Sequence, residues 1–239
     1  MNTSNKSGTL YLIPVPLGPV STDSCLPTDT LSVARQLDHF VAERAKTARA
    51  HLKAMGHPKP LQELHISELN EHTQASEIEH LLAPLKAGYD TGLMSEAGCP
   101  GVADPGADLV RAAHKAGITV VPLIGPSSIL LALMASGLGG QRFAFHGYLP
   151  AKEPERTQKI RELEKFARRD KATQLFIETP YRSAVLLDAL AQVLAPDTLI
   201  SVAADLSLPG QFTQTLNAKS WKAKASLVKD RLVVLGIGV

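Results

Sequence analysis

Short apolar runs alternate with helical patterns along almost the whole chain, and this alternation limits the folds that the chain can adopt. The apolar runs predict strands at Thr9–Pro14, His39–Glu43, Gln62–Ser67, Thr91–Ser95, Ile118–Leu123, Arg142–Leu149, Thr173–Thr179, Thr198–Asp205, Gln211–Leu216 and Arg231–Ile237. Apolar residues at helical spacing fall between these runs. Such an order is typical of α/β proteins, whose parallel or mixed sheets are covered by helices.

The helical patterns have recognisable ends. We expect helices at Ala45–Met55, Ser76–Ala87, Ala107–Ala116, Ile129–Ala135 and Tyr181–Ala195. The first three are followed directly by Gly56, Gly88 and Gly117. Glycine is the residue most often found just past the end of a helix, so these glycines predict where the three helices stop.

A break near residues 122–126 divides the chain into two halves of similar length. We predict an N-terminal α/β domain over residues 1–122 and a C-terminal α/β domain over residues 123–239. Beyond Asp205 the simple alternation stops, and Leu208-Pro209-Gly210 joins two expected strands by a turn. We therefore expect a mostly parallel first sheet and a mixed second sheet, with the strand order left open.

The composition narrows the setting in which the protein works. Hydrophobic residues make up 44% of the 239 residues, which favours a folded core over global disorder. The net charge of +2 is too small to indicate tight nucleic-acid binding. Cys25 and Cys99 match no metal or redox spacing and are expected to be free thiols. The polar start Met1–Gly8 and the lack of an apolar run of about 18 residues predict a cytoplasmic protein without a membrane span.

The segment Ser95–Gly106 lies between an expected strand and an expected helix. It holds three glycines, two prolines and two acids. Ligands of open α/β sheets bind outside the carboxyl ends of the strands. Glycine allows a close backbone approach there, and proline stiffens the loop. Taken alone, the segment fits two interpretations equally well: a binding loop and an ordinary connection between a strand and a helix.

Two other loops carry the same ambiguity. Pro14–Pro19 has three prolines, so it offers few N–H groups to a phosphate and suits an adenosine recognised by shape. A rigid surface turn explains it equally well. Gly125-Pro126-Ser127-Ser128 precedes a helix, where a serine caps the helix or binds a ligand carboxylate or ribose.

Charged residues follow two of the expected strands. Glu178 and Arg182 flank the end of one strand, and Glu43 ends another. A glutamate at such a position either faces a cleft or caps the next helix. The stretch Lys152–Lys171 has a net charge of +3 and is either a solvated helix face or a contact for RNA phosphates. The scattered histidines share no metal-site spacing, so no metal is expected.

Taken in order, these loops resemble those of the tetrapyrrole methylase superfamily of S-adenosylmethionine-dependent methyltransferases. The nearest branch is the one that 2′-O-methylates a cytidine of small-subunit ribosomal RNA. The chain matches five loop patterns of this branch: P-x-P-I/L-G at Pro14–Gly18, S-D-A-G-x-P-x-x-x-D-P-G at Ser95–Gly106, P-x-P-G-P at Pro122–Pro126, R-F-x-x-x-G-F/Y-L-P at Arg142–Pro150 and F-x-E-S/T-P-x-R at Phe176–Arg182. Glu96 stands in place of the aspartate, and Ile124 in place of one proline. The resemblance covers nearly the whole chain.

The resemblance implies two α/β domains that bind S-adenosylmethionine between them, usually in a homodimer. The cofactor-binding residues that it implies are Pro16, Ala97, Gly98, Cys99, Val102, Ser127, Ser128 and Leu206. Glu43 and Glu178 are the candidate bases for an oxygen acceptor, and Arg182 is the candidate that orients it. No metal is needed for methyl transfer.

Several charged positions depart from the ribosomal branch. Arg44-Ala45-Lys46 replaces D-T-R, Ala204–Leu208 replaces R-E-L-T-K, and Lys229–Arg231 replaces K-G-E. We therefore expect a methyltransferase whose acceptor is RNA or a related molecule and differs from that branch's cytidine. The alternatives are a tetrapyrrole or other small-molecule methylase, and a non-catalytic module that binds S-adenosylmethionine.

Overall fold

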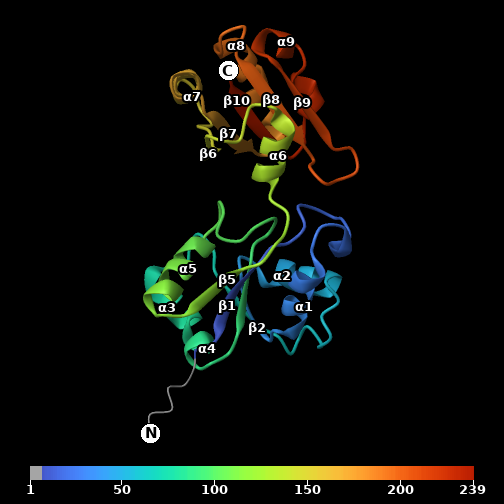
Figure 1. Ribbon diagram of the computed structural model, residues 1–239, viewed down its shortest axis with the longest axis vertical. Coiled ribbons are helices and arrows are strands. Elements are labelled where there is room, and N and C mark those ends of the chain that lie inside the picture. Colours follow the sequence, from blue (N-terminus) through green and yellow to red (C-terminus); the bar gives the residue numbers. More distant parts are fainter. Residues whose placement is uncertain (1–6) are drawn as a thin grey trace. The chain divides into compact units, whose positions relative to one another are not determined.

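The computed structural model describes residues 7–239, so residues 1–6 of the polar start lie outside the described residues. The chain divides into two compact units, Met1–Ser127 and Ser128–Val239 (Figure 1). This division falls a few residues after the predicted boundary at 122/123. The cause lies in the residues past β5: the Leu123 amide donates to the Leu12 carbonyl at 3.0 Å, and the Thr30 hydroxyl donates to the Ile124 carbonyl at 2.8 Å. Each unit is described by itself.

The first unit is built on a parallel sheet. Within the described residues it has five strands in the order β3-β2-β4-β1-β5, and every pairing is parallel. The strands are β1 (Thr9–Ile13), β2 (His39–Ala42), β3 (His65–Glu68), β4 (Thr91–Met94) and β5 (Thr119–Pro122). Because the sheet is parallel, the segments that follow β1, β4 and β5 all leave from one edge.

Helices cover both faces of this sheet (Figure 1). They are α1 (Thr28–Gln36), α2 (Ala45–Ala54), α3 (Ala75–Leu81), α4 (Ala83–Lys86) and α5 (Gly106–Lys115), and a short 3-10 helix spans Thr22–Ser24. Leu31 of α1 and Leu52 of α2 pack with Phe40 of β2 in one core layer. Leu109 of α5 packs with Leu10 of β1 in the layer on the other face. The side chains of each strand therefore alternate between two apolar layers.

The expected helices of the first unit are present with two differences. Gly56, Gly88 and Gly117 have φ of 74°, 94° and 70°, so the three predicted glycine stops are confirmed. The predicted helix Ser76–Ala87 is two helices, because Pro84 lies in the first turn of α4 and proline cannot continue a preceding helix. Helix α1 was not predicted; its buried face is made by Thr30, Leu31 and Ala34, a short and weakly apolar pattern.

The second unit is built on a mixed sheet in the order β6-β7-β10-β8-β9. The strands are β6 (Phe143–Tyr148), β7 (Thr173–Glu178), β8 (Leu199–Ala204), β9 (Phe212–Asn217) and β10 (Val233–Gly238). β6 and β7 are parallel, whereas β10 is antiparallel to both of its neighbours. β8 and β9 form the antiparallel pair expected from the Leu208-Pro209-Gly210 turn, so that prediction is confirmed.

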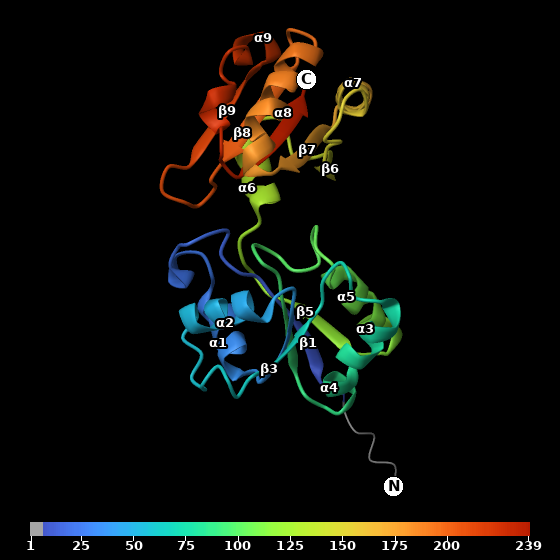
Figure 2. The ribbon, with the colours of Figure 1, turned by 180° about the vertical axis from the view of Figure 1, so that it is seen from behind.

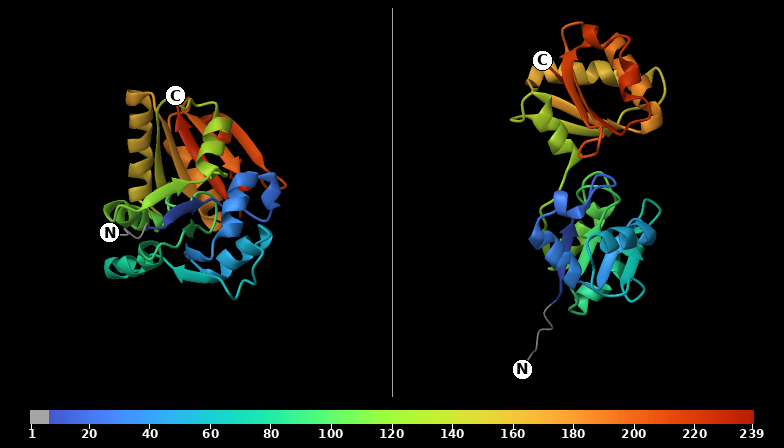
Figure 3. Two further views of the ribbon diagram at one scale, coloured as in Figure 1. Left: turned by 60° about the horizontal axis from the view of Figure 1, so that its bottom comes forward. Right: turned by 90° about the vertical axis from the view of Figure 1, so that its right-hand side faces the viewer.

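Helices also cover this second sheet. They are α6 (Ser128–Ser136), α7 (Glu155–Asp170), α8 (Pro180–Val193) and α9 (Ala218–Trp221), with a 3-10 helix at Ala225–Val228. Ile160 of α7, Leu187 of α8 and Trp221 of α9 share one core with Phe176 of β7 and Leu235 of β10. Figure 2 shows α8 lying along this sheet, and the left view of Figure 3 shows the long helix α7 in gold.

Candidate functional site

Three glycine- and proline-rich loops meet at the carboxyl edge of the first sheet. They are the loop after β1 (residues 14–19), the loop after β4 (residues 95–105) and the segment after β5 (residues 123–127). The first two loops are joined as an antiparallel bridge. The Val15 amide donates to the Gly98 carbonyl at 2.9 Å, and the Gly98 amide donates to the Val15 carbonyl at 3.1 Å. Two segments about 80 residues apart in the sequence therefore share one backbone contact.

The third loop packs closely against the other two. The Cys99 thiol donates to the Pro126 carbonyl at 3.3 Å. A Cβ atom on Gly125 would lie 2.3 Å from the Pro14 Cβ, which is inside van der Waals contact. A Cβ atom on Gly98, whose φ is +74°, would lie 3.3 Å from the Leu17 side chain. The glycines are therefore needed for the close approach of the loops.

The loop after β4 also holds its own shape. The Ser95 hydroxyl lies 3.2 Å from the carbonyl oxygens of Ala97 and Gly98. The Asp104 carboxylate accepts from the Gly101 amide at 2.8 Å and the Gly106 amide at 2.9 Å. Side-chain bonds to backbone groups thus fix both ends of the loop. Between them, Ala97 and Val102 are exposed.

Glu96 ties this loop to helix α2. Its carboxylate accepts from the Thr47 hydroxyl at 3.0 Å, and its carbonyl oxygen lies 3.2 Å from the His51 Nε2. Thr47 and His51 are one helical turn apart and so share a face of α2. Sequence reasoning did not find either residue, because the only signal was the glutamate standing where the family pattern has aspartate.

An open cavity of about 720 Å³ lies beside this loop. Its lining is largely polar and consists of Glu43, Arg44, Glu68, Asn70, Glu71, His72, Ala103, Asp104 and Pro105. Burial raises the pKa of the Glu43 carboxyl above its ordinary value, and the negative charges of Asp104 and Glu96 raise it further, against the lowering effect of Arg44. Burial also raises the pKa of Asp104, which its two backbone amide donors partly offset.

Glu178 and Arg182 lie in the second unit and bind each other. The Glu178 carboxylate is buried and accepts from the Arg182 Nε at 2.9 Å and from a terminal nitrogen of Arg182 at 2.7 Å. It also accepts from the amide and the hydroxyl of Thr179. Both carboxylate oxygens are therefore engaged, and the pair fixes the turn from β7 into α8.

Two of the altered charged segments of the second unit also meet. Arg231 Nε donates to the Asp205 carboxylate at 2.6 Å, and the Leu232 amide donates to the same carboxylate at 3.2 Å. Arg231 further donates to the Gly210 carbonyl. The charges at these two departures from the family pattern thus bind each other and hold the β8–β9 hairpin to the start of β10.

Five of the predicted cofactor-binding residues lie together in the first unit. Pro16, Ala97, Gly98, Cys99 and Val102 all belong to the joined loops of the first unit. Ser127 ends that unit, whereas Ser128 begins α6 and Leu206 lies buried in the β8–β9 turn of the second unit.

Among residues 7–239, no group of three or more His, Cys, Asp or Glu side chains is arranged to hold a metal ion. No helix in the same residues is both long and apolar enough to cross a bilayer.

Comparison with known proteins identifies relatives of the chain. A family model described as Tetrapyrrole (Corrin/Porphyrin) Methylases matches residues 10–220. A curated protein from Escherichia coli O157:H7, named Ribosomal RNA small subunit methyltransferase I, is 35% identical over 194 residues, 81% of this chain and 63% of the relative. Proteins of the same name from Xylella fastidiosa and Bacillus subtilis are 36% and 34% identical over 84% and 86% of this chain, and 69% and 66% of their own length. The chain thus spans less than two thirds of the Escherichia coli relative.

Solved structures share the fold. The methyltransferase CobJ has a TM-score of 0.64 at 21% identity, over 97% of this chain and 94% of its own. Uroporphyrin-III-C-methyltransferase from Thermus thermophilus has a TM-score of 0.58 at 18% identity, over 97% of this chain and 92% of its own. The predicted fold class, a parallel and a mixed α/β unit of the tetrapyrrole methylase type, is confirmed.

Gly125→Ala tests the close packing of the loops. The added methyl group would overlap the Pro14 ring, so we expect the free energy of unfolding to fall by about 1–3 kcal/mol. Chemical denaturation measures this change. Gly140→Ala is the control, because its Cβ would lie 3.6 Å from Leu133, an ordinary contact. Equal stability of the two variants would contradict the packing described.

Thr47→Val tests the link between α2 and the loop after β4. Valine keeps the shape of threonine but removes the donor to Glu96, so we expect a loss of about 1 kcal/mol and faster amide exchange at residues 95–99. Hydrogen exchange followed by mass spectrometry provides the measurement. Thr119→Val, at an exposed position of the edge strand β5, is the matched control. Unchanged exchange in Thr47→Val would show that the bond does not restrain the loop.

Proposed function

Because the chain belongs to the tetrapyrrole methylase family, we propose that it is an S-adenosylmethionine-dependent methyltransferase with an RNA acceptor. Enzymes of this family use S-adenosylmethionine as their methyl donor. The observation that carries the proposal is the joining of the loops after β1 and β4 through Val15 and Gly98, at the sheet edge where α/β proteins bind ligands.

The chemistry of these loops suits an adenosyl cofactor. Proline at 14, 16 and 19 removes N–H donors, so the loop after β1 is a poor phosphate cradle. S-adenosylmethionine has no phosphate, and its adenine presents an apolar face. We assign its binding to Pro16, Ala97, Gly98, Cys99 and Val102. Ser127, Ser128 and Leu206 complete the proposed set.

Methyl transfer to an oxygen needs alignment and a base. The acceptor oxygen attacks the methyl carbon in line with the carbon–sulfur bond, which breaks and leaves its electron pair on sulfur. Holding the two reactants at attack distance lowers the activation barrier by several kcal/mol. The acceptor proton passes to a carboxylate. We propose Glu43, because it lines the open cavity and its raised pKa makes it a stronger base than an ordinary glutamate.

Glu178 and Arg182 have a different role in this proposal. The carboxylate of Glu178 already accepts four hydrogen bonds, from Thr179 and Arg182, so it has little capacity to take a proton from the acceptor. We propose that the pair positions the β7–α8 turn. The acceptor is assigned as RNA because the curated relatives are named for ribosomal RNA. The altered segment at 44–46, whose Arg44 lines the open cavity, supports a methylation site other than the branch's cytidine.

We further propose that the protein is a homodimer, because the family resemblance implies one. We also propose that it works in the cytoplasm, because its proposed acceptor is RNA.

Transfer of radiolabel from S-adenosylmethionine tests the function. We expect calorimetry to show that the protein binds S-adenosylmethionine. When the protein is incubated with labelled S-adenosylmethionine and small-subunit ribosomal RNA, we expect the label to enter the RNA. Label in a tetrapyrrole fraction would contradict the RNA acceptor. Cofactor binding with no labelled fraction of a cell extract would contradict the enzyme and leave a binding module.

Glu43→Gln tests the base. We expect the methyl-transfer rate to fall by about 10²–10⁴-fold with unchanged cofactor affinity. Glu68→Gln is the control: Glu68 lines the same cavity, and glutamine keeps its bond from the Ala45 amide. A base must be ionised, so the wild-type rate should rise with pH through the raised pKa of Glu43 and then level off. Equal rates in both variants would exclude Glu43.

Glu43→Gln should also change the free energy of unfolding in a way that depends on pH. A carboxyl whose pKa is raised by folding binds its proton more tightly in the folded protein, so its ionisation destabilises the fold as pH rises above its ordinary pKa. Glu43→Gln should therefore stabilise the protein at pH 7 and have less effect in acid. Thermal unfolding across pH measures this difference, and a Glu43→Gln protein that is less stable at pH 7 would contradict the pKa assignment.

A further inference from the structure

Helix α2 carries a stripe of cations with no acid beside them in the sequence. Residues 44–62 contain five lysines and arginines and no aspartate or glutamate, in a chain with 25 basic and 23 acidic residues. Lys46, Arg49 and Lys53 follow one another at i, i+3 and i+7 of this helix. At 3.6 residues per turn they fall within an arc of about 60°. We call these three residues the α2 stripe.

The α2 stripe is unpaired within the described residues. Residues 7–127 contain nine lysines and arginines, of which four are bonded: Lys59 to Asp38, Lys86 to Glu79, Arg111 to Asp108, and Arg35 to the Met55 carbonyl. In that part of the chain no ion pair or hydrogen bond engages the side chains of the stripe. Lys46 and Lys53 are exposed, and Arg49 is half-buried.

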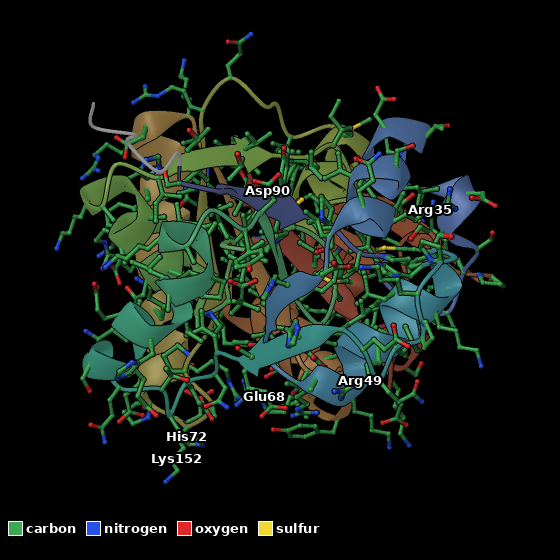
Figure 4. The ribbon with its side chains drawn as sticks, turned by 90° about the horizontal axis from the view of Figure 1, so that it is seen from below. Arg35, Arg49, Glu68, His72, Asp90 and Lys152 are labelled. Atoms are coloured by element: carbon green, nitrogen blue, oxygen red, sulfur yellow. The ribbon has the colours of Figure 1, made fainter. Side chains whose placement is uncertain are left out.

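The remaining faces of α2 are already occupied. Ala48 and Leu52 pack in the core, and Thr47 and His51 hold Glu96 of the loop after β4. By helical spacing the stripe lies on the side away from Thr47 and His51. Figure 4 shows Arg49 on this helix. The stripe is therefore a fixed, positively charged surface on the helix that anchors the candidate cofactor loop.

We propose that the α2 stripe binds the phosphodiester backbone of the RNA acceptor; this inference rests on the proposed function. Lys46 and Lys53 are about 10 Å apart along the helix axis. A nucleic-acid strand presents about three phosphates over that length, one for each cation. A membrane surface fits less well, because the exposed residues flanking the stripe are Ala50 and Ala54 and not large apolar side chains.

The alternative basic surface, α7, is largely neutralised by acids on the helix and next to it. Arg156, Lys159, Arg168 and Arg169 pair with Glu153, Glu162, Asp197 and Asp170. In the described chain Lys152, Arg161, Lys165 and Lys171 have no such partner, but acids are interleaved with them in the sequence. The structure thus favours α2 over the segment Lys152–Lys171, for which the sequence pattern left a solvated helix face and an RNA contact as alternatives.

Salt-dependent binding tests this inference. The full chain with S-adenosylmethionine is titrated with transcribed small-subunit ribosomal RNA at several salt concentrations. The variant Lys46→Gln/Arg49→Gln/Lys53→Gln loses three phosphate contacts, so the slope of log affinity against log salt should become shallower by about 2–3. Affinity at low salt should fall by roughly 10–100-fold, because each phosphate contact contributes to non-specific binding. Lys152→Gln/Arg161→Gln/Lys165→Gln removes the same charge and should change the slope by less than about 1.

The outcomes separate the inference from the function on which it rests. A wild-type slope in the α2 variant, or a larger loss in the α7 variant, overturns the inference while methylation of RNA by the wild type stands. If the wild type binds no S-adenosylmethionine, the proposed function fails; if it binds no RNA, both fail.

Binding to phosphatidylserine vesicles is a second experiment. If the α2 variant loses vesicle binding but keeps its RNA binding, the stripe binds a membrane and the inference is overturned. Unchanged affinity for S-adenosylmethionine in both variants shows that the fold is intact.

Discussion

The backbone bridge between Val15 and Gly98 is the contact on which the candidate site depends. It joins the loops after β1 and β4, and it forms only because Gly98 has a positive φ and no side chain between Leu17 and Pro126. Gly125 then brings the third loop against the Pro14 ring. The position of each loop is thus set by the other two, and none of them could be replaced by an arbitrary connection of the same length.

Much of the fold could be predicted from local sequence signals. Strand positions follow from apolar runs, and Gly56, Gly88 and Gly117 end their helices because their φ angles are positive. Strand order could not be predicted, since it depends on contacts between segments far apart in the chain. Helix α1 lacks a strong apolar stripe, and its position depends on the core that covers it. Pro84 shows the reverse case, a local signal that splits one predicted helix.

The candidate site also has a part that the sequence predicts and a part that it does not. The loops could be identified together because each has a distinctive glycine and proline pattern that reflects its backbone geometry. The partners of Glu96 could not, because threonine and histidine on α2 are common residues whose role depends on where the helix lies. Glu178 and Arg182 are four residues apart at a strand-to-helix turn, and in the structure they pair with each other. Charge counts left α7 as either a solvated helix face or an RNA contact, and the ion pairs of the structure show that four of its six cations are paired.

Amide hydrogen exchange with and without S-adenosylmethionine tests the central claim most directly, namely that the joined loops of the first unit bind this cofactor. We predict that the cofactor slows exchange at residues 15–18 and 97–102. Both segments should respond together, since the Val15–Gly98 bridge couples them. Binding of S-adenosylmethionine that leaves these amides unprotected, or that protects a different edge of the first sheet, would contradict the claim.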